Sequence, residues 1–125
     1  MKSAKGYFEE KLKFEIDPWG VRQLIENGGR MCLIDVRDSD SYAKGHIPGA
    51  INAPIDALES SLSKIRIPKR GAAIIVYCYN IACFRATRAA LELSRKGFAN
   101  VVEMVGGFEE WAKHGYDVEK ARSKG

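Results

Sequence analysis

The chain has 125 residues, of which 46% are hydrophobic and 29% charged. These values fit one globular domain and exclude a disordered chain, collagen or a coiled coil. The net charge of +4 lies mainly at the two ends and in residues 64–70. This pattern predicts no continuous basic surface that could bind a phosphate backbone, so we expect no nucleic-acid partner. Three cysteines, an odd number, argue against a disulfide-stapled secreted domain and predict reduced thiols in the cytoplasm.

In chain order, the first predicted elements are a short amphipathic helix over 6–12 and an extended segment over 13–16. Asp17 and Pro18 then indicate a helix start, because an acidic N-cap precedes a proline at the first helical position. This helix is predicted over 19–27. The N-terminus is polar and lacks the apolar stretch of a signal peptide, which favours a cytoplasmic location.

The middle of the chain alternates between strand-like and helix-like segments. Residues 31–36 form a continuous apolar segment, which is typical of a strand buried on both faces. A short helix is predicted at 39–44, a short strand at 50–53, and a helix at 55–65, where apolar residues recur at helical spacing. A linker over residues 68–71 follows this helix, at the end of the basic segment 64–70.

The second half contains the strongest strand prediction, at residues 72–78. A helix over 85–96, a strand over 101–104 and a helix through Phe108 and Trp111 complete the pattern. Strands separated by helices indicate a parallel sheet covered on both faces. The longest apolar run, at 72–78, is far shorter than the ~20 residues that cross a bilayer, so we expect no membrane association.

Chemistry in an open parallel sheet is expected beyond the carboxyl ends of the strands. Asp35 and Arg37 follow one predicted strand, and the segment 78–84 joins another strand to a helix. The amides of such a loop and the positive end of the helix form a cradle for an anion. A cysteine facing this cradle would have a lowered pKa and would be a thiolate at neutral pH. Its position makes Cys78 the candidate nucleophile.

We expect different surroundings for the other two cysteines, Cys32 and Cys83. Cys32 lies inside an apolar strand and is predicted to be a core residue. Cys83 lies five positions after Cys78, so its thiol could approach the same cradle or pack under the helix. Three cysteines and two histidines do not form spaced ligand pairs, so neither a metal nor a cofactor is expected.

Three stretches of the sequence resemble the single-domain rhodanese family over about residues 15–118. They are residues 33–38 with 42–52, residues 75–78 with 85–90, and residues 105–111. The resemblance implies an α/β fold of the rhodanese-like type, with a five-stranded parallel sheet flanked by helices on both faces. Residues 1–14 would then form an N-terminal extension with a short helix, and residues 119–125 a basic tail.

The resemblance also implies a thiosulfate-type sulfurtransferase. In rhodaneses a loop cysteine, here Cys78, takes a sulfane sulfur from a small donor and carries it as a persulfide. The sulfur passes to a thiophilic acceptor, which is cyanide, a thiol or a sulfur-accepting protein. Asp35 and Arg37 would brace the site as an ion pair, and Arg85 or Arg88 would hold an anionic donor. The substrate-binding loop would comprise Tyr79, Asn80, Ile81, Ala82, Cys83, Phe84 and Arg85.

The loop departs from the common rhodanese pattern in length and composition. Rhodanese loops usually contain glycine and place an arginine five positions after the cysteine, whereas Arg85 stands seven positions after Cys78 and no glycine lies between. Two alternatives therefore stay open: a redox or persulfide-relay protein that uses Cys78 and Cys83, and a non-catalytic binding module. A phosphatase or arsenate reductase fits less well, because those enzymes place five residues between cysteine and arginine and this chain has six.

Overall fold

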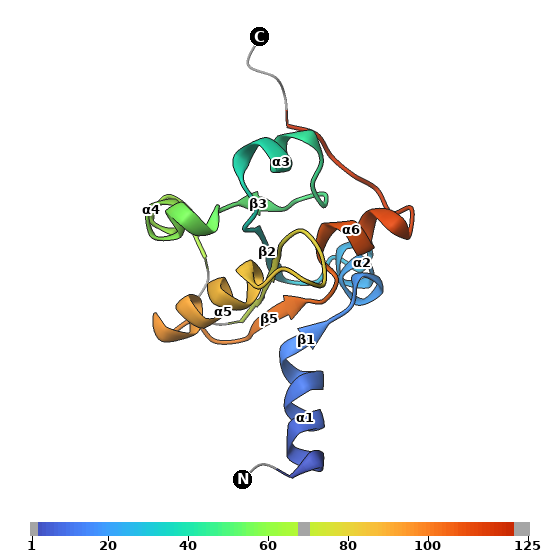
Figure 1. The fold of residues 1–125 in the computed structure, drawn as a ribbon, viewed down its shortest axis with the longest axis vertical. Helices are drawn as coiled ribbons and strands as arrows, with labels where there is room; N and C mark the ends of the chain where they lie inside the picture. Colours follow the sequence, from blue (N-terminus) through green and yellow to red (C-terminus); the bar gives the residue numbers. More distant parts are fainter. Residues whose placement is uncertain (1–2, 68–70, 122–125) are drawn as a thin grey trace.

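Five strands form one parallel sheet in the computed structural model, which describes residues 3–67 and 71–121 (Figure 1). In chain order the strands are β1 (Glu15–Ile16), β2 (Met31–Asp35), β3 (Ile51–Asn52), β4 (Ala73–Tyr77) and β5 (Val101–Met104). Their order in the sheet is β1-β5-β4-β2-β3, and every neighbouring pair is parallel. The predicted five-stranded parallel sheet is therefore confirmed, with β4 at its centre.

Six α-helices and one short 3-10 helix accompany the described strands. They are α1 (Ala4–Phe14), α2 (Pro18–Glu26), α3 (Ser39–Lys44), η1 (Ile55–Ala57), α4 (Leu58–Ser63), α5 (Arg85–Arg95) and α6 (Gly107–Lys113). The single helix predicted over 55–65 is wrong, because the backbone of Ala57 leaves the helical region at φ −128° and ψ 29° and separates η1 from α4. Residues 68–70 of the basic linker and 122–125 of the tail lie outside the described residues.

Helices cover both faces of the sheet, and successive residues of β4 are buried in two different cores. Ile74 and Val76 belong to one core, which includes the inner face of α5. Ile75 and Tyr77 belong to the other core, together with Trp111 of α6. Successive residues of a strand point to opposite faces, so one fully buried strand anchors both cores. The expected helical layers on both faces are confirmed.

Helix α1 stands apart from these cores and projects from the body of the domain (Figure 1). It is longer than the predicted 6–12, and none of its residues is buried. Its first turn is capped by the Ser3 hydroxyl, which accepts a hydrogen bond from the Gly6 amide at 3.1 Å. No helix within the described part of the chain has the length and apolar character to span a membrane.

Candidate functional site

The loop between β4 and α5 lies at the carboxyl end of the central strand. Its turn is organised by Asn80, whose backbone carbonyl accepts from the Cys83 amide at 3.0 Å. The Asn80 side chain accepts from the Ala82 amide, also at 3.0 Å. An asparagine that bonds to the backbone two residues further on makes a local turn without glycine. The long loop without glycine is thus held in shape by one polar side chain.

This turn brings two of the three cysteines together at the start of α5. The Cys78 thiol donates a hydrogen bond to the Cys83 carbonyl at 3.4 Å, and it also contacts the Cys83 thiol. The Cys83 sulfur accepts from the Arg85 amide at 3.5 Å and from the Arg85 Nη1 at 3.4 Å. The amide of Ala86 bonds to the Cys78 sulfur. The first amides of α5, which have no partner within the helix, therefore point at both sulfurs.

The two thiols differ in burial and in acidity. Cys78 is 3% exposed, and burial, followed by the hydrogen bond to Cys83, raises its pKa to about 12. Cys83 is half-buried. Partial burial raises the pKa of Cys83, but the bonds from the Cys78 thiol and from Arg85 outweigh it and lower that pKa to about 7. The sequence predicts the lowered pKa at Cys78, whereas in the structure burial raises the pKa of Cys78 and the contacts with Arg85 lower that of Cys83, the less buried sulfur.

Both sulfurs line a pocket of about 250 Å³. Its other walls come from the loop, from β5 and from the turn before α6. Lys11 of α1 also lines it and forms an ion pair with Glu15 at 2.5 Å. Sequence reasoning missed Lys11, because only the tertiary placement of α1 brings this cation to the pocket. Among the described residues, no group of three or more His, Cys, Asp or Glu side chains is placed to hold a metal ion.

The start of α6 supports the loop from the other side. The amide of Phe108 donates to the Cys78 carbonyl at 2.8 Å, and the amide of Glu109 donates to the Tyr79 carbonyl at 2.9 Å. Gly107 makes this contact possible, because its φ is +63° and a Cβ there would lie 2.6 Å from the Cys78 carbonyl oxygen. Gly107 thus allows the backbone at the start of α6 to lie directly against the backbone of the β4–α5 loop.

Asp35 and Arg37 form a buried ion pair beneath the loop. Asp35 is fully buried and Arg37 is 4% exposed. Arg37 donates from Nη2 to the carboxylate at 2.7 Å and to the Gly45 carbonyl at 2.6 Å. Its guanidinium lies 4.3 Å from the ring centre of Phe108, at the start of α6. The pair therefore ties β2 to the turn after α3 and to the helix that holds the loop.

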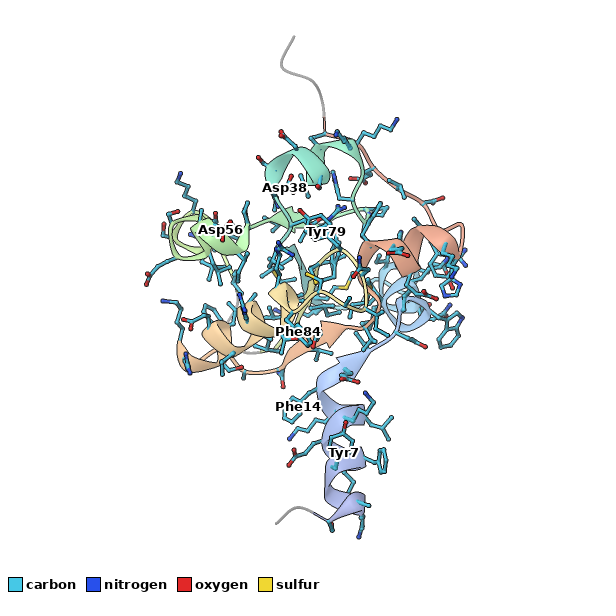
Figure 2. All side chains as sticks on the ribbon, viewed as in Figure 1. Tyr7, Phe14, Asp38, Asp56, Tyr79 and Phe84 are labelled. Carbon is cyan, nitrogen blue, oxygen red and sulfur yellow. The ribbon has the colours of Figure 1, made fainter. Side chains whose placement is uncertain are left out.

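Tyr79 connects the loop to α3. Figure 2 shows its ring between the loop and Asp38, and its hydroxyl donates to the Asp38 carboxylate. This bond, with those from Ser41, lowers the pKa of Asp38 to about 2. The Arg85 guanidinium lies 5.2 Å from the centre of the Tyr79 ring. Tyr79 thus fixes one end of the loop and supports the arginine that faces Cys83.

A family model for the rhodanese-like domain matches residues 19–114. The chain belongs to the rhodanese-like domain family. A thiosulfate sulfurtransferase, GlpE of Pseudomonas paraeruginosa, is 38% identical over 96 residues, which cover 77% of this chain and 81% of GlpE. The protein YqhL of Bacillus subtilis is 37% identical over 79 residues, and this chain spans 59% of its length. The crystal structure of BH2092 from Bacillus halodurans has a TM-score of 0.85 at 36% identity, covering 94% of this chain and 84% of that one.

In this rhodanese-like domain the predicted site residues separate into two groups. Cys78, Cys83 and Arg85 come together at the start of α5. Ile81 and Phe84 also line the pocket of the two sulfurs, but they are 79% and 70% exposed. Cys32 is 8% exposed within the core that faces α5, as predicted. The loop therefore presents a polar, sulfur-lined interior and an apolar rim.

Proposed function

We propose that this rhodanese-like domain is a sulfurtransferase that moves a sulfane sulfur from a small anionic donor, such as thiosulfate, through a persulfide on Cys78. The observation that carries the proposal is the place of the Cys78 sulfur, directly after β4 and against the backbone amides of Tyr79 and Ala86. Preorganised amides stabilise the negative charge of a thiolate and of a persulfide. The sulfurtransferase relatives support the same chemistry.

The raised pKa of Cys78 requires a base to produce its thiolate. Cys83 is suited to this task, because its thiol contacts the Cys78 thiol and its own pKa is about 7. The proton passes to Cys83, and the Cys78 thiolate attacks the outer sulfur of thiosulfate. The sulfur–sulfur bond of the donor breaks and sulfite leaves with the electron pair. Cys78 then carries the transferred sulfur as a persulfide.

Acceptors then remove the outer sulfur and regenerate the Cys78 thiolate. Cyanide, a low-molecular-weight thiol and a protein thiol are all suitable by chemistry. Arg85 supplies positive charge beside Cys83, which favours an anionic donor, whereas Lys11 at the pocket wall is paired with Glu15. Three free thiols are typical of a reducing compartment, which supports a cytoplasmic location.

The direct test is turnover with thiosulfate and cyanide, measured as thiocyanate, with mass spectrometry of the protein after thiosulfate alone. The wild type is expected to gain one sulfur atom, and Cys78→Ser is expected to gain none. Cys32→Ala, which removes a thiol far from the pocket, serves as the matched control and should behave as wild type. A wild type that takes up no sulfur, or a fully active Cys78→Ser, refutes the proposal. Unreactive, occluded Cys78 would favour a binding module instead.

A further inference from the structure

The second thiol of the loop has no part as a sulfur carrier in a one-cysteine mechanism. Nevertheless Cys83 lines the same pocket as Cys78 and contacts its thiol. It also has its own partners, the amide and the guanidinium of Arg85. These contacts are those expected around a sulfur that holds negative charge.

We propose that Cys83 is a second sulfur carrier, which takes the sulfane sulfur from Cys78 and presents it to the acceptor at the surface. The inference rests on the proposed function, since Cys78 must first carry the sulfur. In this scheme the buried Cys78 accepts sulfur from a small donor, and the more exposed Cys83 delivers that sulfur to the acceptor.

The transfer balances without any added oxidant or reductant. The proton held by Cys83 returns to the terminal sulfur of the Cys78 persulfide, and the Cys83 thiolate attacks that sulfur. A new bond forms between Cys83 Sγ and the transferred sulfur, while the bond from that sulfur to Cys78 Sγ breaks. Its electron pair stays on Cys78 Sγ, which takes up the proton of the new persulfide. The products are the Cys78 thiol and a Cys83 persulfide anion.

The surroundings of the two sulfurs favour this direction. The proton ends on Cys78, where burial raises the pKa, and the negative charge ends beside Arg85, which lowers the pKa of Cys83. The guanidinium and the Arg85 amide both donate toward Cys83. A negative charge on Cys83 is therefore better stabilised than a negative charge on the buried Cys78.

Access to the acceptor also differs between the thiols. Cys78 is 3% exposed, whereas Cys83 is half-buried and lies on the outer part of the loop. Ile81 and Phe84, on either side of Cys83 along the chain, are 79% and 70% exposed. An acceptor larger than a small anion meets this rim before it reaches Cys78. A sulfur carried by Cys83 can be reached without passing the side chains of Ile81 and Phe84.

Two measurements on the full chain test the proposal. The first locates the sulfur after thiosulfate treatment and thiol trapping. Both cysteines lie between the trypsin sites at Arg70 and Arg85, so they share one peptide and fragmentation assigns the extra sulfur to one of them. The second compares Cys83→Ser with wild type for transfer to glutathione and to cyanide. Serine keeps an acceptor for the Arg85 amide, and Cys32→Ala again serves as the control.

We expect the sulfur on Cys83 in the wild type and on Cys78 in Cys83→Ser. In single-turnover transfer from protein already loaded with sulfur, where Cys83 is no longer needed as a base, Cys83→Ser should deliver sulfur to glutathione about tenfold or more slowly than wild type. Its transfer to cyanide should fall by less than about threefold, because cyanide is small enough to reach Cys78. Sulfur on Cys78 alone in the wild type, or an undiminished glutathione rate in Cys83→Ser, overturns the relay and leaves the proposed function standing. Release of sulfide with a Cys78–Cys83 disulfide overturns it too. A wild type that takes up no sulfur overturns both.

Discussion

The ion pair between Asp35 and Arg37 allows a quantitative test of how the site is supported. Both side chains are buried, and Arg37 donates to the carboxylate from its backbone amide, from Nε and from Nη2 at distances between 2.7 and 3.1 Å. Removing one partner leaves the other as an uncompensated buried charge, which costs about 3–5 kcal/mol. Asp35→Asn and Arg37→Met are each expected to lower the free energy of unfolding by that amount.

The double variant removes both charges, so its cost should be smaller than the sum of the single costs by ~3 kcal/mol or more. With an unfolding entropy of roughly 2.1 cal/mol/K per residue, a loss of ~4 kcal/mol lowers the melting temperature of 125 residues by about 15 °C. Urea denaturation followed by circular dichroism measures all three variants. Arg95→Met, which breaks an exposed pair with Glu92, is the control and should change stability by less than about 0.5 kcal/mol. Single costs below ~1 kcal/mol, or strictly additive costs, would refute the reasoning.

Two further predictions concern the loop. Alkylation of Cys83 should increase with pH around a midpoint near 7, because only the thiolate reacts and its pKa is about 7. Arg85→Met removes a donor that lowers this pKa and should move the midpoint to higher pH; an unchanged midpoint contradicts the assignment. Gly107→Ala should destabilise by about 3 kcal/mol or more, since φ is +63° and its Cβ would meet the Cys78 carbonyl at 2.6 Å. Gly28→Ala, with φ +65° and no atom within 4 Å, should cost only about 1–2 kcal/mol, and equal costs in urea unfolding would argue against the steric account.

The sheet was largely predictable because its signals are local. The apolar segments at 31–36 and 72–78 correspond to β2 and β4 within one residue at each end, and 101–104 corresponds to β5. Fully buried parallel strands are continuously apolar, so their boundaries appear directly in the sequence. The division of 55–65 into two helices depends on the backbone of one residue, Ala57, which helical spacing does not reveal.

The candidate site was predictable in its members but not in its electrostatics. Cys78 and Arg85 were identified from their place after a strand and at a helix start. The sequence could not indicate which thiol has the lower pKa, because relative burial and the reach of Arg85 to Cys83 depend on how Asn80 folds the loop. The contribution of Lys11 depends on the direction of α1 and has no local signal.

The hydrogen bonds between the loop and the start of α6 give the molecule an internal optical probe. The amides of Phe108 and Glu109 bind the carbonyls of Cys78 and Tyr79, so a shift of the loop backbone is passed directly to this helix. Trp111 lies on the same helix, 2% exposed, with its indole donating to the Asp117 carbonyl at 2.8 Å. Since indole emission depends on its surroundings, the proposed sulfur loading is expected to change the emission of Trp111, above the background of the exposed Trp19, without a label on either cysteine.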